Sequence, residues 1–224
     1  MSNKTRASAA SVDSSLSPVD PNFYDIERLR RYETLQGAAG RVKDDEMSAL
    51  DAIFAGRKLD DARCDSFLDL GTCTGRYLRW AQARGFSQVA GMDHSPHAVR
   101  FCREEIGLRD CDIYTADCTE ESSFSALSGT DLITMMMGTL HHLTAAGVSE
   151  MMTSVAGIAR DEAQFVVSTW QQTPMDLELY TPREARGFGN IDYAALLRHE
   201  SGRHWVLQDI HETANLRLWL FLRL

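Results

Sequence analysis

A short apolar run that breaks into a glycine-punctuated turn is the feature of this sequence with the clearest chemical meaning. Residues 67–70 predict a buried strand, and Gly71 and Gly75 follow in a turn that leads into a predicted helix. In α/β proteins, a strand, a glycine-rich turn and a helix in this order form the usual binding site for an adenosine-containing cofactor. The turn therefore predicts a cofactor site at the carboxyl end of a strand.

Acidic side chains stand where the next two predicted strands end. Asp93 ends the second strand, where a carboxylate commonly accepts hydrogen bonds from ribose hydroxyls. Asp117 follows the third strand. Both residues have an alternative role, because aspartates at such positions also cap helices or accept hydrogen bonds from loop amides.

The spacing of the glycines separates two classes of cofactor. A dinucleotide site requires glycine at three places that are Gly71, Cys73 and Arg76 in this chain, so NAD is disfavoured. The spacing of Asp69, Gly71 and Gly75 instead resembles the DxGxGxG turn of class I S-adenosylmethionine-dependent methyltransferases. Cys73 replaces the central glycine of that pattern, and its Cβ would crowd the ligand if the backbone required a positive φ.

This resemblance covers about residues 67–169 and implies a role for each landmark. It implies that Asp93 holds the ribose, that Asp117 accepts the adenine amino group and that the amide of Cys118 faces a ring nitrogen. Residues 131–143 resemble the fourth-strand segment of small-molecule members, which lies beside the transferable methyl. The residues expected to bind S-adenosylmethionine are Arg41, Asp69, Gly71, Cys73, Gly75, Asp93, His94, Asp117, Cys118 and Met136.

Two histidines are the candidates for proton transfer. Methyl transfer from a sulfonium requires alignment, desolvation and an uncharged or deprotonated nucleophile. If the acceptor is an amine or a hydroxyl, His141 or His142 is the expected base, because imidazole titrates near neutral pH. The alternative is that both side chains pack or bond the backbone.

Aromatic and cationic side chains supply the candidate substrate contacts. Ring faces favour a cationic sulfonium, which makes Tyr24, Tyr32 and Trp170 candidate walls of the acceptor site. Core packing is the commoner role of such residues. The resemblance implies that an arginine of the leading segment meets the cofactor carboxylate, and Arg41 is the candidate. Arg183, in the insertion after the last parallel strand, is a candidate grip for a substrate carboxylate or phosphate.

Alternating strands and helices must position these residues. Strands are expected over 66–70, 88–92, 112–115, 131–136 and 164–169, with helices over 76–84, 96–105, 145–159 and 193–199. This alternation predicts an α/β fold with a doubly wound, Rossmann-like, mostly parallel sheet. Runs 205–210 and 216–222 predict a C-terminal antiparallel hairpin. The resemblance implies a seven-stranded sheet whose last strand is antiparallel.

Smaller features complete the expected arrangement. Helical spacing over 24–35 and 44–54 predicts two helices before the sheet. Ser95 is expected to cap the helix that begins at Pro96. The period-two rule places Met135 and Met137 on one face of their strand and Met136 on the other.

Composition excludes several classes of partner. The net charge of −9 gives no general attraction to nucleic acid or to anionic lipid. No apolar run reaches the length that a membrane span needs. The five cysteines contain no CxxC pair, which suggests neither a disulfide framework nor a metal site and favours a cytoplasmic location. A homodimer stays an open alternative.

The sequence thus leads to three regions and two functional hypotheses. We expect a disordered tail over 1–21, a helical segment over 22–60 that covers the active site, and a class I methyltransferase domain over 61–224. The first hypothesis is methyl transfer from S-adenosylmethionine to a small molecule, such as an amino acid or a specialised metabolite. The second is a non-catalytic member of the fold that binds the cofactor and acts as an interaction or regulatory protein.

Overall fold

A single mixed sheet organises the structure, a computed structural model that describes residues 20–35, 37–55, 65–171 and 191–224. Over these residues the sheet has seven strands in the order β3-β2-β1-β4-β5-β7-β6. The first five strands in the chain pair in parallel, and β7 lies antiparallel between β5 and β6. The strands are β1 (Ser66–Leu70), β2 (Gln88–Asp93), β3 (Asp112–Thr115), β4 (Thr130–Met135), β5 (Ala159–Trp170), β6 (Trp205–Glu212) and β7 (Leu216–Arg223).

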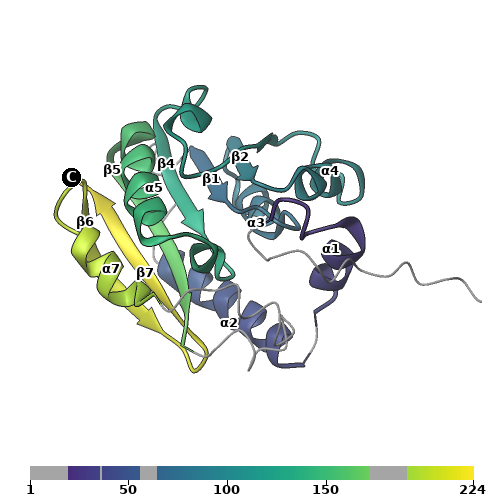
Figure 1. Cartoon of the computed structure of the whole chain (residues 1–224), viewed down its shortest axis with the longest axis horizontal. Coiled ribbons are helices and arrows are strands. Elements are labelled where there is room, and N and C mark those ends of the chain that lie inside the picture. Colours follow the sequence, from purple (N-terminus) through teal and green to yellow (C-terminus); the bar gives the residue numbers. More distant parts are fainter. Residues whose placement is uncertain (1–19, 36, 56–64, 172–190) are drawn as a thin grey trace, which may run out of the picture.

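Helices cover both faces of the sheet (Figure 1). The helices are α1 (Ile26–Glu33), α2 (Gly37–Phe54), α3 (Arg76–Arg84), α4 (Pro96–Glu104), α5 (Ala145–Ile158) and α7 (Tyr193–Glu200), with 3-10 turns η1 (Glu121–Phe124) and η2 (Thr139–His142). Buried side chains of α2 and α3, such as Leu50 and Leu78, pack on one face. Those of α5 and α7, such as Val155 and Leu197, pack on the other. The predicted doubly wound α/β architecture with a C-terminal antiparallel hairpin is confirmed.

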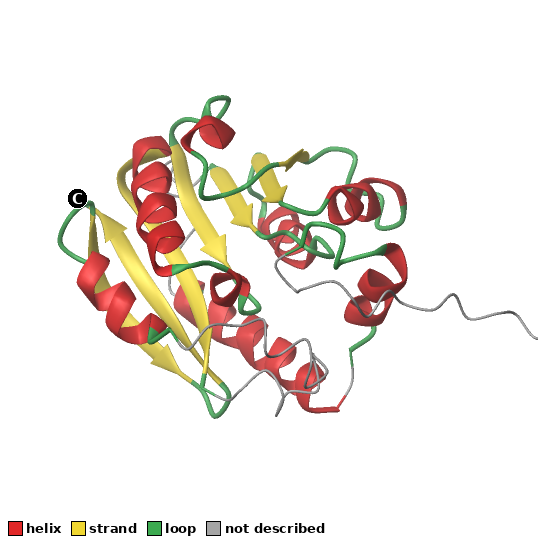
Figure 2. Cartoon of the chain, viewed as in Figure 1, coloured by secondary structure: helices red, strands yellow, loops and turns green. Residues whose placement is uncertain are grey.

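Strand β1 lies inside the sheet between β2 and β4, and all five of its residues are buried. Its alternate side chains serve the two layers, with Phe67 in the α2–α3 core and Leu68 and Leu70 in the α5–α7 core. The parallel strands point to the same edge (Figure 2), so the turns after β1, β2, β3 and β4 meet there.

The N-terminal helices are joined to the rest of the chain by both packing and charge. Leu29 of α1 packs against Ala98 and Phe101 of α4. Ion pairs add to this contact: Arg30 to Glu105, with 2.6 Å between Nη2 and Oε1, and Arg79 to Glu33, with 2.7 Å between Nη2 and Oε1. Helix α1 is therefore fixed to the face of the sheet that carries α3 and α4, and Leu50 of α2 packs in the core on the same face.

Element boundaries differ from the expectation where apolar spacing is weak. Helix α2 begins at Gly37 rather than at residue 44, because Gly37 and Gly40 obscure the helical pattern of its first turns. Strand β5 begins at Ala159 rather than at residue 164, because its first residues are mostly exposed and a register shift separates them from the buried part.

Two local predictions are wrong. Ser95 precedes α4 but makes no side-chain cap, because its hydroxyl donates to the carbonyl oxygen of Tyr24 at 3.3 Å. Met137 does not share a face with Met135, because β4 ends at Met135 and Met137 has a φ of 52°. Met135 packs in the α5–α7 core, whereas Met136 and Met137 pack against the α2–α3 core.

Candidate functional site

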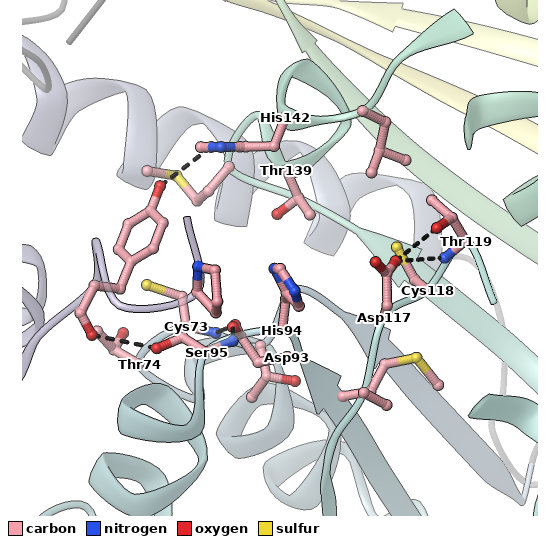
Figure 3. A pocket seen from close by; sticks show the side chains of 18 of the residues that line it. Cys73, Thr74, Asp93, His94, Ser95, Asp117, Cys118, Thr119, Thr139 and His142 are labelled. Atoms are coloured by element: carbon pink, nitrogen blue, oxygen red, sulfur yellow. Dashed lines mark hydrogen bonds between the residues drawn. The ribbon is translucent and has the colours of Figure 1, made fainter. Parts of the chain in front are cut away.

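A cavity of about 350 Å³ opens where the carboxyl ends of the parallel strands meet. Its walls are the turn after β1, the end of β2, the loop after β3, the segment that contains η2, and residues before and within α1. Figure 3 shows Asp93 and Asp117 on one side of this cavity and Thr139 and His142 on the opposite side.

The turn after β1 is held by backbone hydrogen bonds and left-handed residues. The amides of Gly71 and Thr72 donate to the carbonyl of Met92 at 2.8 and 3.1 Å. Gly71 has a φ of 76°, and a Cβ there would overlap the side chain of Thr139, so only glycine fits. Cys73 has a φ of 48°, so the backbone at this position does have the positive φ that the sequence alone could not decide. Its side chain packs beside α1 and α4.

Asp93 connects this turn to the end of β2. Its Oδ2 accepts from the amide of Cys73 at 2.7 Å and its Oδ1 from the amide of Ser95 at 2.8 Å. Burial raises the pKa of the Asp93 carboxyl, and these amides act in the opposite direction. Each carboxylate oxygen has a second lone pair, so Asp93 retains capacity for hydroxyl donors in the cavity. The neighbouring His94 also lines the cavity.

Asp117 and Cys118 line the cavity from the loop after β3. Oδ1 of Asp117 accepts from the amide and the hydroxyl of Thr119, at 2.9 and 2.8 Å, so the alternative role of holding the loop is present. Within the described residues its other oxygen makes no hydrogen bond. Burial, with the Asp117 charge, raises the pKa of the Cys118 thiol to about 12 and keeps it neutral.

Asp69 and Gly75 lie behind the cavity wall rather than in it. Asp69 is 1% exposed, and its Oδ1 accepts from the hydroxyl of Thr134 at 2.7 Å. Its Oδ2 has no hydrogen-bond partner. Burial, followed by the charges of Asp93 and Glu46, raises the pKa of Asp69 well above its ordinary value. A Cβ on Gly75 would lie 2.5 Å from Leu108, so this glycine permits close packing.

The cationic wall of the cavity is formed by Arg76 and not by Arg41. Arg41 is exposed on α2 and is not among the lining residues. Arg76, the first residue of α3, lines the cavity, and its Nη1 is buried without a hydrogen-bond partner. Nothing in the spacing of the glycine turn marks Arg76, the residue after Gly75, as a candidate for binding the cofactor carboxylate. Met136 is also buried outside the cavity, whereas Met137 lines it.

The two neighbouring histidines face different cavities. His142 lines the main cavity, and its Nε2 lies 3.1 Å from the hydroxyl of Tyr24. His141 and Trp170 line a second cavity of about 250 Å³, with their rings stacked at 4.9 Å. The amide of Trp170 donates to Nε2 of His141 at 3.2 Å. His141 of η2 and Trp170 at the end of β5 therefore lie outside the main cavity, where the sequence had placed them.

Two aromatic side chains, one before α1 and one within it, lie at the main cavity. Tyr24 and Tyr32 both line it, and their rings meet edge to face at 5.7 Å. Arg183 lies outside the described residues.

Sequence reasoning missed Glu46, which no motif marks. It lies on the buried face of α2 with Val42, Ala49 and Leu50, which are four positions before and three and four positions after it. An acidic residue at a core position of an amphipathic helix is the signal that would have identified it. Tyr77, which also lines the cavity, donates its hydroxyl hydrogen to Glu46.

Comparison with known proteins adds a family and a fold. Residues 67–162 match the family described as methyltransferase domain. The PH0226 protein of Pyrococcus horikoshii OT3 shares 14% identity with a TM-score of 0.62, covering 82% of this chain and 91% of that chain. A search of curated proteins gave no match.

Two further solved structures carry the product form of the cofactor. The N-methyltransferase NodS from Bradyrhizobium japonicum WM9, in complex with S-adenosyl-L-homocysteine, shares 12% identity with a TM-score of 0.58 over 81% of this chain and 86% of that chain. The magnesium protoporphyrin IX methyltransferase ChlM from Synechocystis PCC 6803, with S-adenosyl-L-homocysteine bound, shares 16% identity with a TM-score of 0.58 over 88% and 93%. At identities this low, the similarity to these structures shows a common fold and nothing more specific.

The described residues contain no helix that is long and apolar enough to cross a membrane. The glycine turn, the strand order and the matched family agree with the resemblance drawn from the sequence. Residues 67–162 match the family described as methyltransferase domain, and the chain shares the fold of solved methyltransferases that bind S-adenosyl-L-homocysteine.

Proposed function

We propose that this protein transfers a methyl group from S-adenosylmethionine to a small-molecule acceptor. The observation that carries the proposal is the meeting of the β1 turn, Asp93 and Asp117 around one cavity of about 350 Å³. Landmarks that are far apart in the sequence thereby form a single surface of the size that a nucleoside cofactor requires.

Four polar side chains in and behind the cavity wall suit groups of the cofactor. Asp93 has lone pairs available for ribose hydroxyls, and the free oxygen of Asp117 suits the adenine amino group. At the other end, Arg76 has a buried Nη1 without a partner, which suits a carboxylate. The unpartnered Oδ2 of Asp69, one layer behind, suits an ammonium reached directly or through water. The amino-acid part of S-adenosylmethionine carries both of these charges.

The cofactor supplies an electrophilic methyl on a sulfonium sulfur, and the chain has to align the acceptor and accept its proton. His142 and Tyr24 share a hydrogen bond at the cavity wall, and neutral imidazole at that place accepts a proton from an amine or hydroxyl. Tyr32 and Tyr24 add ring faces that favour positive charge.

A small acceptor fits the surroundings of the cavity better than a polymer. The net charge of −9 opposes a phosphate backbone, and Asp20, Pro21 and Tyr24 line the cavity beside α1. In this proposal the helical segment over 22–60 is the cover of the active site, and residues 61–224 are the methyltransferase domain.

Calorimetric titration with S-adenosylmethionine and S-adenosylhomocysteine tests the cofactor site directly. Asp93→Asn should weaken binding about tenfold or more, because hydrogen bonds to a charged group are worth ~1.5–3 kcal/mol. The control is Asp112→Asn. Asp112 is exposed at the start of β3, away from the cavity, so this variant loses the same charge and should bind the cofactor as the wild type does. Absence of binding in the wild type would refute the proposal.

Release of S-adenosylhomocysteine in the presence of pooled amino acids and specialised metabolites then tests the reaction. Turnover that depends on one pool component identifies the acceptor. Cofactor binding without turnover in any pool would favour the second hypothesis, a non-catalytic protein that retains the cofactor.

A further inference from the structure

A buried carboxylate from α2 reaches the edge of the sheet beside the main cavity. Glu46 is 0% exposed and lies among the apolar side chains of its helix face. It is outside residues 67–162, which match the methyltransferase family. Glu46 therefore comes from the N-terminal segment of this chain, whereas its partners Tyr77 and Met137 lie within the matched residues.

Hydrogen bonds from three separate parts of the chain satisfy this carboxylate. The amide of Met137 donates to both oxygens, at 2.9 and 3.1 Å. The hydroxyl of Tyr77 donates to Oε2, and Ser168 of β5 adds a side-chain hydrogen bond. Glu46 thus joins α3, β5 and the segment after β4 to α2.

The segment that Glu46 holds has an unfavourable backbone conformation. Met137 has a φ of 52°, which side chains with a Cβ rarely adopt, and Gly138 follows with a φ of 73°. Met137 and Thr139 line the main cavity. The hydrogen bond at the Met137 amide therefore fixes a left-handed turn that forms part of the cavity wall.

Burial of a carboxylate at this place in the core costs free energy. Burial raises the pKa of Glu46, while its hydrogen bonds and the nearby charge of Arg76 act in the opposite direction. The second buried carboxylate, Asp69, lies close enough for the two charges to disfavour each other. An apolar side chain would avoid both costs but would leave the Met137 amide and the Tyr77 hydroxyl without an acceptor.

We propose that Glu46 is a positioning residue of the methyltransferase site, which sets the Met137 turn and the Tyr77 ring at the cavity wall. The proposal rests on the proposed function only in taking this cavity as the cofactor site. It makes α2 a working part of the site in addition to a cover.

Three variants separate positioning from ordinary stabilisation. Glu46→Gln keeps the size of the side chain and removes its charge. Tyr77→Phe keeps Glu46 and removes one donor. Asp51→Asn is the matched control on the same helix, because Asp51 accepts from Nε1 of Trp80 at 2.8 Å and pairs with Arg84 away from the cavity. Thermal unfolding of each variant measures the structural cost.

Hydrogen exchange of the peptide that covers residues 136–143 and calorimetric titration with S-adenosylmethionine are the two readouts. In Glu46→Gln we expect at least about tenfold faster exchange at Met137 and about tenfold weaker binding, because a charged acceptor is lost. In Tyr77→Phe we expect weaker binding with the Met137 amide still protected. In Asp51→Asn we expect wild-type exchange in this peptide and binding within about twofold, whatever its melting temperature.

The outcomes decide between the two proposals. If Glu46→Gln matched the wild type in exchange and in binding, or if Asp51→Asn changed both equally, the positioning role would be refuted. If the wild type bound no S-adenosylmethionine, the proposed function would fail, and exchange alone would decide whether Glu46 holds the turn. If Glu46→Gln did not fold, Glu46→Asp, which keeps the charge and shortens the reach, would replace it under the same criteria.

Discussion

The hydroxyl of Tyr24 lies 3.1 Å from Nε2 of His142, although 118 positions separate the two residues in the sequence. One residue precedes α1 and the other ends η2, and both line the main cavity. Their hydrogen bond orients the imidazole that we propose as the proton acceptor, so the two side chains should act as one unit.

Removal of either member of this pair should lower turnover more than cofactor binding. We expect Tyr24→Phe and His142→Gln each to reduce the rate of S-adenosylhomocysteine release about 10²-fold with the acceptor identified by screening. The cofactor dissociation constant should change by less than about threefold. The double variant should be no slower than the slower single variant, because the pair acts together. Additive losses would show that the two side chains act independently.

Arg76 and Arg41 make a matched pair of substitutions. We expect Arg76→Gln to weaken S-adenosylmethionine binding by about tenfold or more, because its buried Nη1 has no hydrogen-bond partner in the described residues and suits the cofactor carboxylate. Arg41→Gln should bind as the wild type does, since Arg41 is exposed and outside the cavity wall. Titration calorimetry of the two variants gives the comparison. The reverse order of affinities would show that Arg41, and not Arg76, binds the cofactor carboxylate.

Gly71 and Gly85 separate backbone strain from steric overlap. Both have a positive φ, 76° and 88°, but only a Cβ on Gly71 meets other atoms, because nothing lies within 4 Å of one on Gly85. Gly85→Ala should cost about 1 kcal/mol of unfolding free energy and leave cofactor binding intact. Gly71→Ala should cost more and weaken cofactor binding, since Thr139 has to move. Denaturant unfolding and titration measure the two effects, and equal losses would contradict this account.

The stability of the protein should depend on the protonation of His141. Burial lowers the pKa of His141 from 6.5 to about 4 in the folded chain. The unfolded chain therefore binds the additional proton first, and the contribution of His141 to stability is lost as the pH falls from about 6.5 to about 4. Melting temperatures of the wild type and His141→Gln should converge over this range. A difference that is independent of pH would show that His141 is not buried as a neutral ring.

Glu46 and Asp93 act on stability in the opposite direction, because burial raises their pKa in the folded chain. A carboxyl with a raised pKa favours the folded state at low pH and loses that contribution as the pH rises. The difference between wild type and His141→Gln is therefore the quantity to follow, since both chains share these carboxyls.

The amino-acid sequence by itself determined the α/β fold and the order of most elements. Strand and helix periods are local, so residues 66–70 and 76–84 could be delimited to the residue. The spacing of Asp69, Gly71 and Gly75 resembles the turn of the methyltransferases, whose family model matches residues 67–162. A tight turn limits which residues fit, so such a spacing can be recognised in the sequence.

Tertiary structure alone decided which side chains share a cavity. His141 and His142 are adjacent in sequence, yet a 3-10 turn sends them to different cavities. Arg76 lines the main cavity and Arg41 does not. Glu46 can be recognised only by its contacts with Met137 and Tyr77. Such contacts join elements that are distant in the chain, and no local pattern encodes their distances, because they depend on how the helices pack on the sheet.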